Sequence, residues 1–274
     1  MWFPILLLCL CACALILIYL LAPRRKRDCA PFDRTLYAHR GLHNMDLSRP
    51  ENSLAAFKAA KDAGYGVEFD VRYTADRQVV VFHDDTLSRM CGIDRRVDEC
   101  TYSELKQYSL LNTQENVPLL SEVLEMLGDV PLLCEIKAMR SYFDTSLCED
   151  TMKLLNNYNG KFCIESFNPF MVRWFKQNAP QVIRGILSKK YSKQDLSSGV
   201  LRPILSSLFT NCLCRPDFIA YCHTDIRQPF LRICRWFNPP MFAWTIRTID
   251  EAKQCCDVFD TYIFEGFLPS QKSE

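Results

Sequence analysis

The stretch GVEFDVRYT, residues 66–74, is the part of the sequence that decides the fold. Val, Phe and Tyr, which favour strands, alternate in it with two acids, Glu68 and Asp70. Residues 75–78 form an expected turn that leads into the apolar segment 79–83. Because so short a connection is typical of a hairpin, we interpret the second segment as an extension of the first strand.

Apolar runs and amphipathic stretches alternate on both sides of this segment. We expect eight strands, at residues 35–39, 66–74, 130–137, 162–167, 182–187, 217–222, 241–246 and 259–264. Helices are expected at residues 53–64, 119–127, 144–158, 169–178 and 250–256. Apolar strands that alternate with helices indicate an α/β fold with a covered parallel sheet, and eight such units fit a TIM (β/α)8 barrel. An open doubly wound sheet is the alternative, although no GxGxxG follows a strand.

The first 22 residues carry no charge and precede Pro23 and the basic run Arg24–Arg27. A helix of that length spans about 33 Å, enough for a bilayer core of roughly 30 Å. A signal peptide is the competing interpretation, but it expects positive charge before the apolar run. We therefore expect a transmembrane anchor at 1–22, a basic linker at 23–34 and a catalytic barrel domain at 35–270. The positive-inside rule then predicts a single-pass membrane protein with its catalytic domain in the cytoplasm.

Composition narrows the choice of partners. The net charge is +1, which gives no electrostatic reason to expect nucleic acid. The local basic cluster is better suited to the anionic headgroups of a membrane. Fifteen cysteines include no pair of CxxC motifs with zinc-finger spacing, and we expect mostly buried, reduced thiols. Protein partners and oligomeric state are not indicated by the sequence.

Active sites of such barrels lie at the C-terminal ends of the strands. Polar residues at the expected strand ends give a compact set: His39, Arg40, Glu68, Asp70, His83, Glu135 and Lys137. Glu68 and Asp70 are two residues apart, so both face one side of their strand, where they repel each other and lose hydration. A divalent cation would offset both costs, with Glu135 as a third oxygen ligand, and an all-carboxylate set suits Mg²⁺ or Ca²⁺ better than zinc. Salt bridges from Arg72 or Lys137 explain the acids equally well.

Two of the four histidines, His39 and His83, stand at expected strand ends beside these acids. A lone histidine there is more often structural, but a converging pair can act as general acid and base. Arg40 offers a planar fork for phosphate oxygens, and Lys137 a compact charge. Together these groups indicate hydrolysis of a phosphodiester.

The motifs resemble those of the glycerophosphodiester phosphodiesterase family over residues 36–263. The resemblance rests on these segments: His39-Arg40-Gly41, Pro50-Glu51-Asn52-Ser53-Leu54-x-Ala56-Phe57, Glu68-x-Asp70-Val71, Thr74-x-Asp76, Val80-x-x-His83-Asp84, Leu87-x-Arg89, Val117-Pro118-Leu119-Leu120-x-Glu122-Val123-Leu124, Glu135-Ile136-Lys137, Ser166-Phe167-Asn168 and Trp244-Thr245. It implies a TIM barrel, one divalent metal ion, and hydrolysis of glycerophosphodiesters to glycerol 3-phosphate and an alcohol.

The resemblance also implies roles for individual residues. The metal ligands would be Glu68, Asp70 and Glu135, the acid–base pair His39 and His83, and the phosphate-binding residues Arg40 and Lys137. Glu51 would lie near the metal or brace Arg40, and Trp244 would form an apolar wall of the pocket. The family's last strand often ends in Thr-Asp-x-Pro, whereas Phe264-Glu265-Gly266-Phe267 stands here, so no role is transferred to that position.

Three other functions stay open at this point. A lysophospholipase D-like enzyme would act on a lysophospholipid, which keeps one acyl chain, and the anchor and the segment 201–213 favour it. A phosphatidylinositol-cleaving phospholipase shares the barrel and two histidines but fits the acid set less well. A catalytically inactive, membrane-tethered binding module would be expected to have lost a ligand or a histidine.

Overall fold

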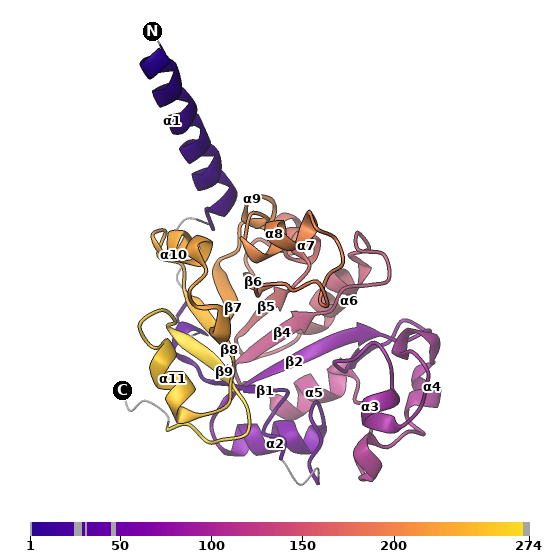
Figure 1. Cartoon of the computed structure of the whole chain (residues 1–274). Helices are drawn as coiled ribbons and strands as arrows, with labels where there is room; N and C mark the ends of the chain where they lie inside the picture. Colours follow the sequence, from indigo (N-terminus) through magenta and orange to yellow (C-terminus); the bar gives the residue numbers. More distant parts are fainter. Residues whose placement is uncertain (1, 25–28, 31, 45–47, 271–274) are drawn as a thin grey trace.

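The computed structural model describes residues 2–24, 29–30, 32–44 and 48–270, and it contains a closed barrel of parallel strands (Figure 1). The barrel strands are β1 (Tyr37–His39), β2 (Gly66–Tyr73), β4 (Leu132–Ile136), β5 (Phe162–Ser166), β6 (Ile183–Ser188), β7 (Phe218–Cys222), β8 (Met241–Ile246) and β9 (Thr261–Phe264). Closure comes from β1, which pairs with β2 through Tyr37 opposite Gly66 and with β9 through Tyr37 opposite Ile263. The prediction of a TIM barrel is confirmed, and the open sheet was wrong.

Helices follow most strands and cover the barrel. They are α2 (Leu54–Asp62), α3 (Ser88–Cys91), α4 (Tyr102–Leu105), α5 (Leu120–Leu127), α6 (Ser146–Leu155), α7 (Pro169–Asn178), α8 (Leu201–Ser206), α9 (Asn211–Cys214), α10 (Pro229–Arg235) and α11 (Ile249–Cys255). The strand β3 (Val79–Val81) pairs antiparallel with β2, as the short turn predicted. The helices α3, α4, α8, α9 and α10 were not expected, because elements of four to seven residues are too short to show a helical period.

Aromatic side chains fill the barrel near the N-terminal ends of its strands. Phe218 stacks on Phe242 with ring centroids 4.5 Å apart, and Tyr37 lies 6.1 Å from Phe242 on the other side. Gly185 is required beside this stack, because a Cβ there would lie 2.1 Å from the Phe218 ring. Cys29 belongs to the same buried cluster. Stacked aromatic rings therefore close the barrel at this end.

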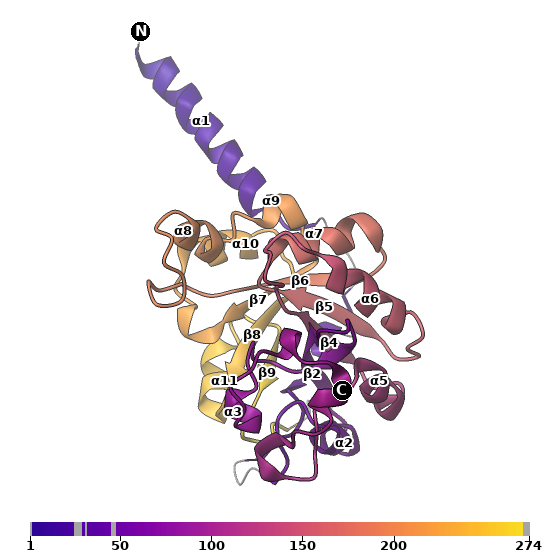
Figure 2. The ribbon, with the colours of Figure 1, turned by 90° about the vertical axis from the view of Figure 1, so that its right-hand side faces the viewer.

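The helix α1 (Trp2–Leu21) projects away from the barrel in both views (Figure 1, Figure 2). Its length and apolar composition are sufficient to cross a membrane, and most of its side chains are exposed. Its C-terminal carbonyls bond to the barrel: Asn211 Nδ2 donates to Leu21 O at 2.9 Å, and Arg215 donates to Tyr19 O at 2.9 Å. The barrel thus satisfies carbonyls that a free helix end leaves to water.

Candidate active site

Three buried carboxylates meet at the C-terminal end of the barrel, as the sequence predicted. Glu68 and Asp70 lie on β2 and Glu135 on β4, with Asp70 directly opposite Glu135 in the sheet register. One oxygen from each lies within 4.8 Å of the others, and the three residues are 2%, 1% and 7% exposed. A cluster of this kind concentrates negative charge where water cannot screen it.

Two cations share the cluster with the acids. Lys137 Nζ lies 2.7 Å from both Asp70 Oδ1 and Glu135 Oε1, and Arg40 Nε lies 3.4 Å from Asp70 Oδ2. The alternative of salt bridges therefore holds for Lys137. It fails for Arg72, which donates to the carbonyl of His83 at 2.8 Å.

The acids do not share this compensation equally. Burial raises the pKa of Glu68 well above its usual range, and the charges of Asp70 and Glu135 add to the shift. Burial acts on Asp70 in the same direction, but Lys137 and then Arg40 outweigh it and hold the pKa of Asp70 well below its usual range. Lys137 and Arg40 thus neutralise the Asp70 side of the cluster and leave Glu68 undercompensated, so the cluster has room for additional positive charge. Three carboxylate oxygen donors, of which Glu68 carries uncompensated negative charge, fit a hard divalent cation.

A fourth acid, Glu165, faces the same cluster and was missed from the sequence. It lies on β5 opposite Glu135 and is 1% exposed, and within the described part of the chain its Oε2 has no hydrogen-bond partner. Burial raises the pKa of Glu165 well above its usual range, followed by the charges of Glu68 and Glu135. An acid inside an apolar expected strand was the available signal, the same one that identified Glu68.

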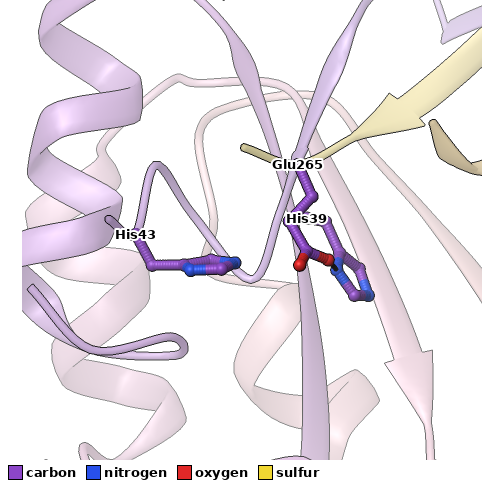
Figure 3. A group of neighbouring side chains, drawn as sticks. All are labelled: His39, His43 and Glu265. Atoms are coloured by element: carbon purple, nitrogen blue, oxygen red, sulfur yellow. Dashed lines mark hydrogen bonds and ion pairs between the residues drawn. The ribbon is translucent and has the colours of Figure 1, made fainter. Parts of the chain in front are cut away.

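The two predicted histidines each contact a carboxylate. His39 ends β1, and its Nδ1 lies 2.7 Å from Glu265 Oε2 (Figure 3). His83 follows β3, and its Nδ1 lies 2.6 Å from Asp84 Oδ1. Burial lowers the pKa of His39 to about 4, with the charge of Arg40 as the second cause, although Glu265 opposes both. The pKa of Glu265 is lowered to about 2, chiefly by the hydrogen bond to His39. At neutral pH, then, the Nδ1–H of His39 donates a hydrogen bond to the ionised Glu265, and Nε2 keeps the lone pair.

Glu265 is a second residue at this end of the barrel that sequence reasoning missed, and it contacts His39. It is the first residue after β9, a position where barrel enzymes place catalytic groups, and this was the available signal. The departure from the family's Thr-Asp-x-Pro pattern drew attention away from it. The structure nevertheless puts a carboxylate there and turns it toward His39.

A chain of ion pairs connects the two sides of the site. Arg40 donates to Glu51 Oε1 at 2.7 Å, Arg89 donates to both Glu51 oxygens at 2.7 and 2.8 Å, and Arg89 Nε donates to Asp84 Oδ2 at 2.7 Å. Glu51 therefore braces Arg40, one of the two positions expected for it. The pKa of Glu51 is lowered to about 2: burial opposes the shift, and Arg89 and Arg40 outweigh it.

An open cleft of about 940 Å³ leads to the cluster, lined among others by His83, Glu135, Lys137, Phe167 and Tyr191. Trp244, on β8, packs edge-on against Phe167 with ring centroids 5.4 Å apart. Its Nε1 is buried without a hydrogen-bond partner among the described residues. This puts Trp244 in contact with a side chain that lines the cleft.

Comparisons with known proteins point to one family. Residues 39–261 match the sequence model of the Glycerophosphoryl diester phosphodiesterase family. The chain is 33% identical to a glycerophosphodiester phosphodiesterase of Caldanaerobacter subterraneus subsp. tengcongensis, over 76% of this chain and 84% of that protein. It is 30% identical to the Homo sapiens protein Lysophospholipase D GDPD1, over 44% of this chain and 41% of that protein. Its fold is similar to an Oleispira antarctica phosphodiesterase solved with the product sn-glycerol-3-phosphate, with a TM-score of 0.67, 22% identity, and 84% and 92% of the two chains covered.

Proposed function

Because the chain belongs to the glycerophosphoryl diester phosphodiesterase family, we propose that it hydrolyses glycerophosphodiesters to glycerol 3-phosphate and an alcohol at the cluster described above. The observation that carries this proposal is the meeting of three buried carboxylates, two cations and two carboxylate-bound imidazoles at one barrel end. Each of these groups has a task in breaking a phosphodiester bond.

The ligands of the metal ion are Glu68, Asp70 and Glu135 in this proposal, and the ion is Mg²⁺ or Ca²⁺. The undercompensated charge of Glu68 and the oxygen-only donor set support this assignment. A bound divalent ion supplies Lewis acidity toward the phosphoryl oxygens. Glu165 would add negative charge behind the ligands without contacting the substrate.

Arg40 and Lys137 are the proposed phosphate-binding residues. Both are mostly buried at the cluster, Arg40 is braced by Glu51, and Lys137 also lines the cleft. A guanidinium held in this way would present its N–H groups in a fixed orientation to the phosphoryl oxygens, where negative charge must be stabilised in the transition state. Trp244 and Phe167 would give the pocket its apolar wall.

His39 and His83 are the proposed general base and general acid. The lowered pKa of His39 keeps its Nε2 lone pair free at neutral pH, which suits a base that removes a proton from the attacking hydroxyl. His83 would then protonate the leaving alkoxide. Glu265 is a positioning residue, because its bond to Nδ1 selects the tautomer in which Nε2 accepts.

The helix α1 supports the further proposal of a membrane anchor at residues 1–22. Arg24 lies at its end, and the remaining basic residues of the predicted cluster, 25–27, lie outside the described residues. With the positive-inside rule we propose a cytoplasmic barrel. We also propose the division into an anchor at 1–22, a linker at 23–34 and a catalytic domain at 35–270, although Cys29 and Phe32 already pack with the barrel core.

A lysophospholipase D activity is the second candidate, and one observation favours it. Phe143 and Val200 are each 70% exposed and follow the C-terminal ends of β4 and β6, on the side of the barrel where the cleft opens. Phe143 also stacks edge-on with Phe170, at 4.7 Å between ring centroids. These side chains would contact an acyl chain or a lipid surface beside the catalytic cluster.

The test compares glycerophosphocholine with lysophosphatidylcholine as substrates for the full chain in detergent. We expect glycerol 3-phosphate from the first substrate, and a fall in rate of about 10²–10⁴-fold for His39→Ala. Faster turnover of the acylated substrate would select the second candidate. If neither substrate is turned over with Mg²⁺ or Ca²⁺ supplied, the alternative of a catalytically inactive binding module would be favoured.

A further inference from the structure

A second cluster of metal-ligand side chains lies beside the acidic one. It consists of His39, His43 and Glu265, and one ligand atom from each lies within 4.8 Å of the others (Figure 3). The His43 imidazole points toward the pair formed by His39 and Glu265. His43 has no part in the reaction proposed above, so that reaction does not explain why its imidazole points toward His39 and Glu265.

We propose that His39, His43 and Glu265 bind Zn²⁺ or a similar borderline divalent ion, and that this ion inhibits the enzyme by occupying His39. The inhibition rests on the proposed catalytic role of His39, whereas the binding site itself does not.

The donor set favours a different metal from the acidic cluster. Two imidazoles and one carboxylate are ligands that zinc and related ions prefer, while Mg²⁺ and Ca²⁺ prefer oxygen alone. Three protein ligands also leave a position open for water. The donor atoms of the acidic cluster thus favour hard cations, and those of the His39, His43 and Glu265 cluster favour borderline cations.

The side chains are already in the protonation states that a metal needs. Burial lowers the pKa of His43, as it lowers the pKa of His39, so both imidazoles are neutral at pH 7. Glu265 is ionised, with a pKa of about 2. An ion can bind without first displacing a proton from a cationic imidazole, which removes a common cost of metal binding.

The backbone around His43 is fixed in place. The Leu42 amide donates to Ala56 O at 2.9 Å, and Arg49 Nε donates to Leu42 O at 2.6 Å. Gly41 has φ +83°, and a Cβ there would lie 2.7 Å from the Ala56 carbonyl carbon, so the turn that presents His43 depends on glycine. A rigid turn opposite two barrel strand ends gives a largely preorganised site.

Binding needs a modest closing of the three side chains. Zinc lies about 2.0–2.1 Å from nitrogen ligands, so tetrahedral donor atoms are about 3.3 Å apart. His39 and Glu265 have side chains that are 16% and 22% exposed, which leaves access from solvent. Arg247, 3.4 Å from Glu265 Oε2 and 58% exposed, would have to turn away. The charges of Arg40 and Arg89 near His43 further limit affinity.

The inhibition follows from the lone pairs of imidazole. A neutral ring has one nitrogen lone pair and one N–H. Coordination through Nε2 takes the lone pair that would accept the proton in catalysis. Coordination through Nδ1 moves the N–H to Nε2 and breaks the bond to Glu265. Either way His39 stays neutral and holds no lone pair for the substrate.

The first experiment measures binding directly on the full-length protein with Co²⁺ as the probe and Mg²⁺ in large excess. We expect visible d–d absorption from imidazole-ligated Co²⁺, displaced by Zn²⁺, and a loss of affinity of roughly tenfold or more in His43→Gln. His223→Gln removes a histidine that lies outside both clusters and has no proposed catalytic role, and this variant should bind Co²⁺ as wild type does. The same Co²⁺ affinity in wild type and His43→Gln would overturn the site.

The second experiment measures glycerophosphocholine turnover against Zn²⁺ concentration. We expect His43→Gln to keep the basal rate and to need at least roughly tenfold more Zn²⁺ for half inhibition, with His223→Gln unchanged. Equal Zn²⁺ sensitivity of wild type and His43→Gln would overturn the inhibitory role. If binding depends on His43 and zinc-loaded enzyme keeps full activity, the site stands and the assignment of His39 as base fails. Absence of turnover without zinc would instead contradict the proposed function.

Discussion

Two side-chain clusters at one end of the barrel differ in burial and in donor chemistry. Glu68, Asp70 and Glu135 are buried, hold only oxygen donors, and are partly neutralised by Lys137. The cluster of His39, His43 and Glu265 is partly exposed and holds nitrogen as well. Burial makes every uncompensated charge in the first cluster costly, so a bound cation would stabilise it. In the second cluster, burial lowers the pKa of both imidazoles and keeps them neutral at pH 7.

The contrast teaches how one barrel end can separate two tasks. Charge stabilisation needs groups that stay ionised in a dry site, and proton transfer needs a group near neutrality. Arg40 lies between the clusters: it pairs with Asp70 on one side and lowers the pKa of His39 on the other.

Asp70→Asn should have the largest effect on activity. It removes a proposed metal ligand and a partner of Lys137, and a fall in kcat/KM of about 10³-fold is expected from the loss of several kcal/mol of charge stabilisation. Steady-state release of glycerol 3-phosphate measures it. Asp62→Asn, at an exposed site on α2, is the matched control and should match wild type. Activity within a factor of three of wild type in Asp70→Asn would contradict its role.

Glu265→Gln should lower kcat by roughly 10²-fold, because an amide can donate to Nδ1 and so favour the wrong tautomer of His39. KM should change little, since Glu265 does not touch the substrate. Glu265→Asp should recover part of the rate. A change confined to KM, or no recovery with Asp, would show that Glu265 acts structurally.

The two clusters should respond in opposite ways in thermal unfolding without metal. The folded-state pKa of Glu68 is raised above its unfolded value of about 4.5, so its contribution to stability is present below pH 4.5 and is lost as pH rises through the folded pKa. Glu68→Gln should therefore raise the Tm of the chelated protein at pH 7 by roughly 2–4 °C. Glu265, whose pKa is lowered to about 2, stabilises above pH 4.5, so Glu265→Gln should lower the Tm.

Scanning calorimetry with a chelator and then with excess Ca²⁺ measures both changes. Added ion should stabilise wild type more than Glu68→Gln, and Glu149→Gln, at an exposed site on α6, serves as control. A lower Tm for chelated Glu68→Gln would mean that Glu68 is well compensated in the fold.

The smallest expected effect is on the pH dependence of kcat/KM. With a pKa of about 4, His39 stays neutral down to pH 5, so kcat/KM at saturating metal should change by less than about threefold between pH 7 and pH 5. A base with an ordinary histidine pKa of about 6.5 would lower kcat/KM about 25-fold over that interval. A fall of that size would show that burial and Arg40 do not control His39.

The part of the site that rests on local periodicity could be predicted from the sequence. Glu68 and Asp70 face one side because strand side chains alternate, and Glu135 follows from strand order in a parallel barrel. The helix 169–178 and the strand 241–246 were also predicted with the bounds of α7 and β8. In these segments the local pattern and the tertiary structure agree.

Contacts between residues far apart in the chain could not be predicted from the sequence. His39 and Glu265 are 226 residues apart and meet only because β1 and β9 close the barrel. Lys137 was expected either at the phosphate or in salt bridges with the acids, and only the structure shows that it bridges Asp70 and Glu135. Glu165 was overlooked because a single acid carries no spacing to its partners. Each of these depends on which strands become neighbours, and no local pattern encodes that.

The central claim is that the buried carboxylates form a metal-dependent phosphodiesterase site. It is tested most directly by glycerol 3-phosphate release from glycerophosphocholine before chelation, after chelation, and after Mg²⁺ or Ca²⁺ is returned, with Asp70→Asn in parallel. We predict full loss on chelation, recovery with one of the two ions in wild type, and no recovery in Asp70→Asn. Turnover that persists in the chelated enzyme, or that returns equally in Asp70→Asn, would contradict the account.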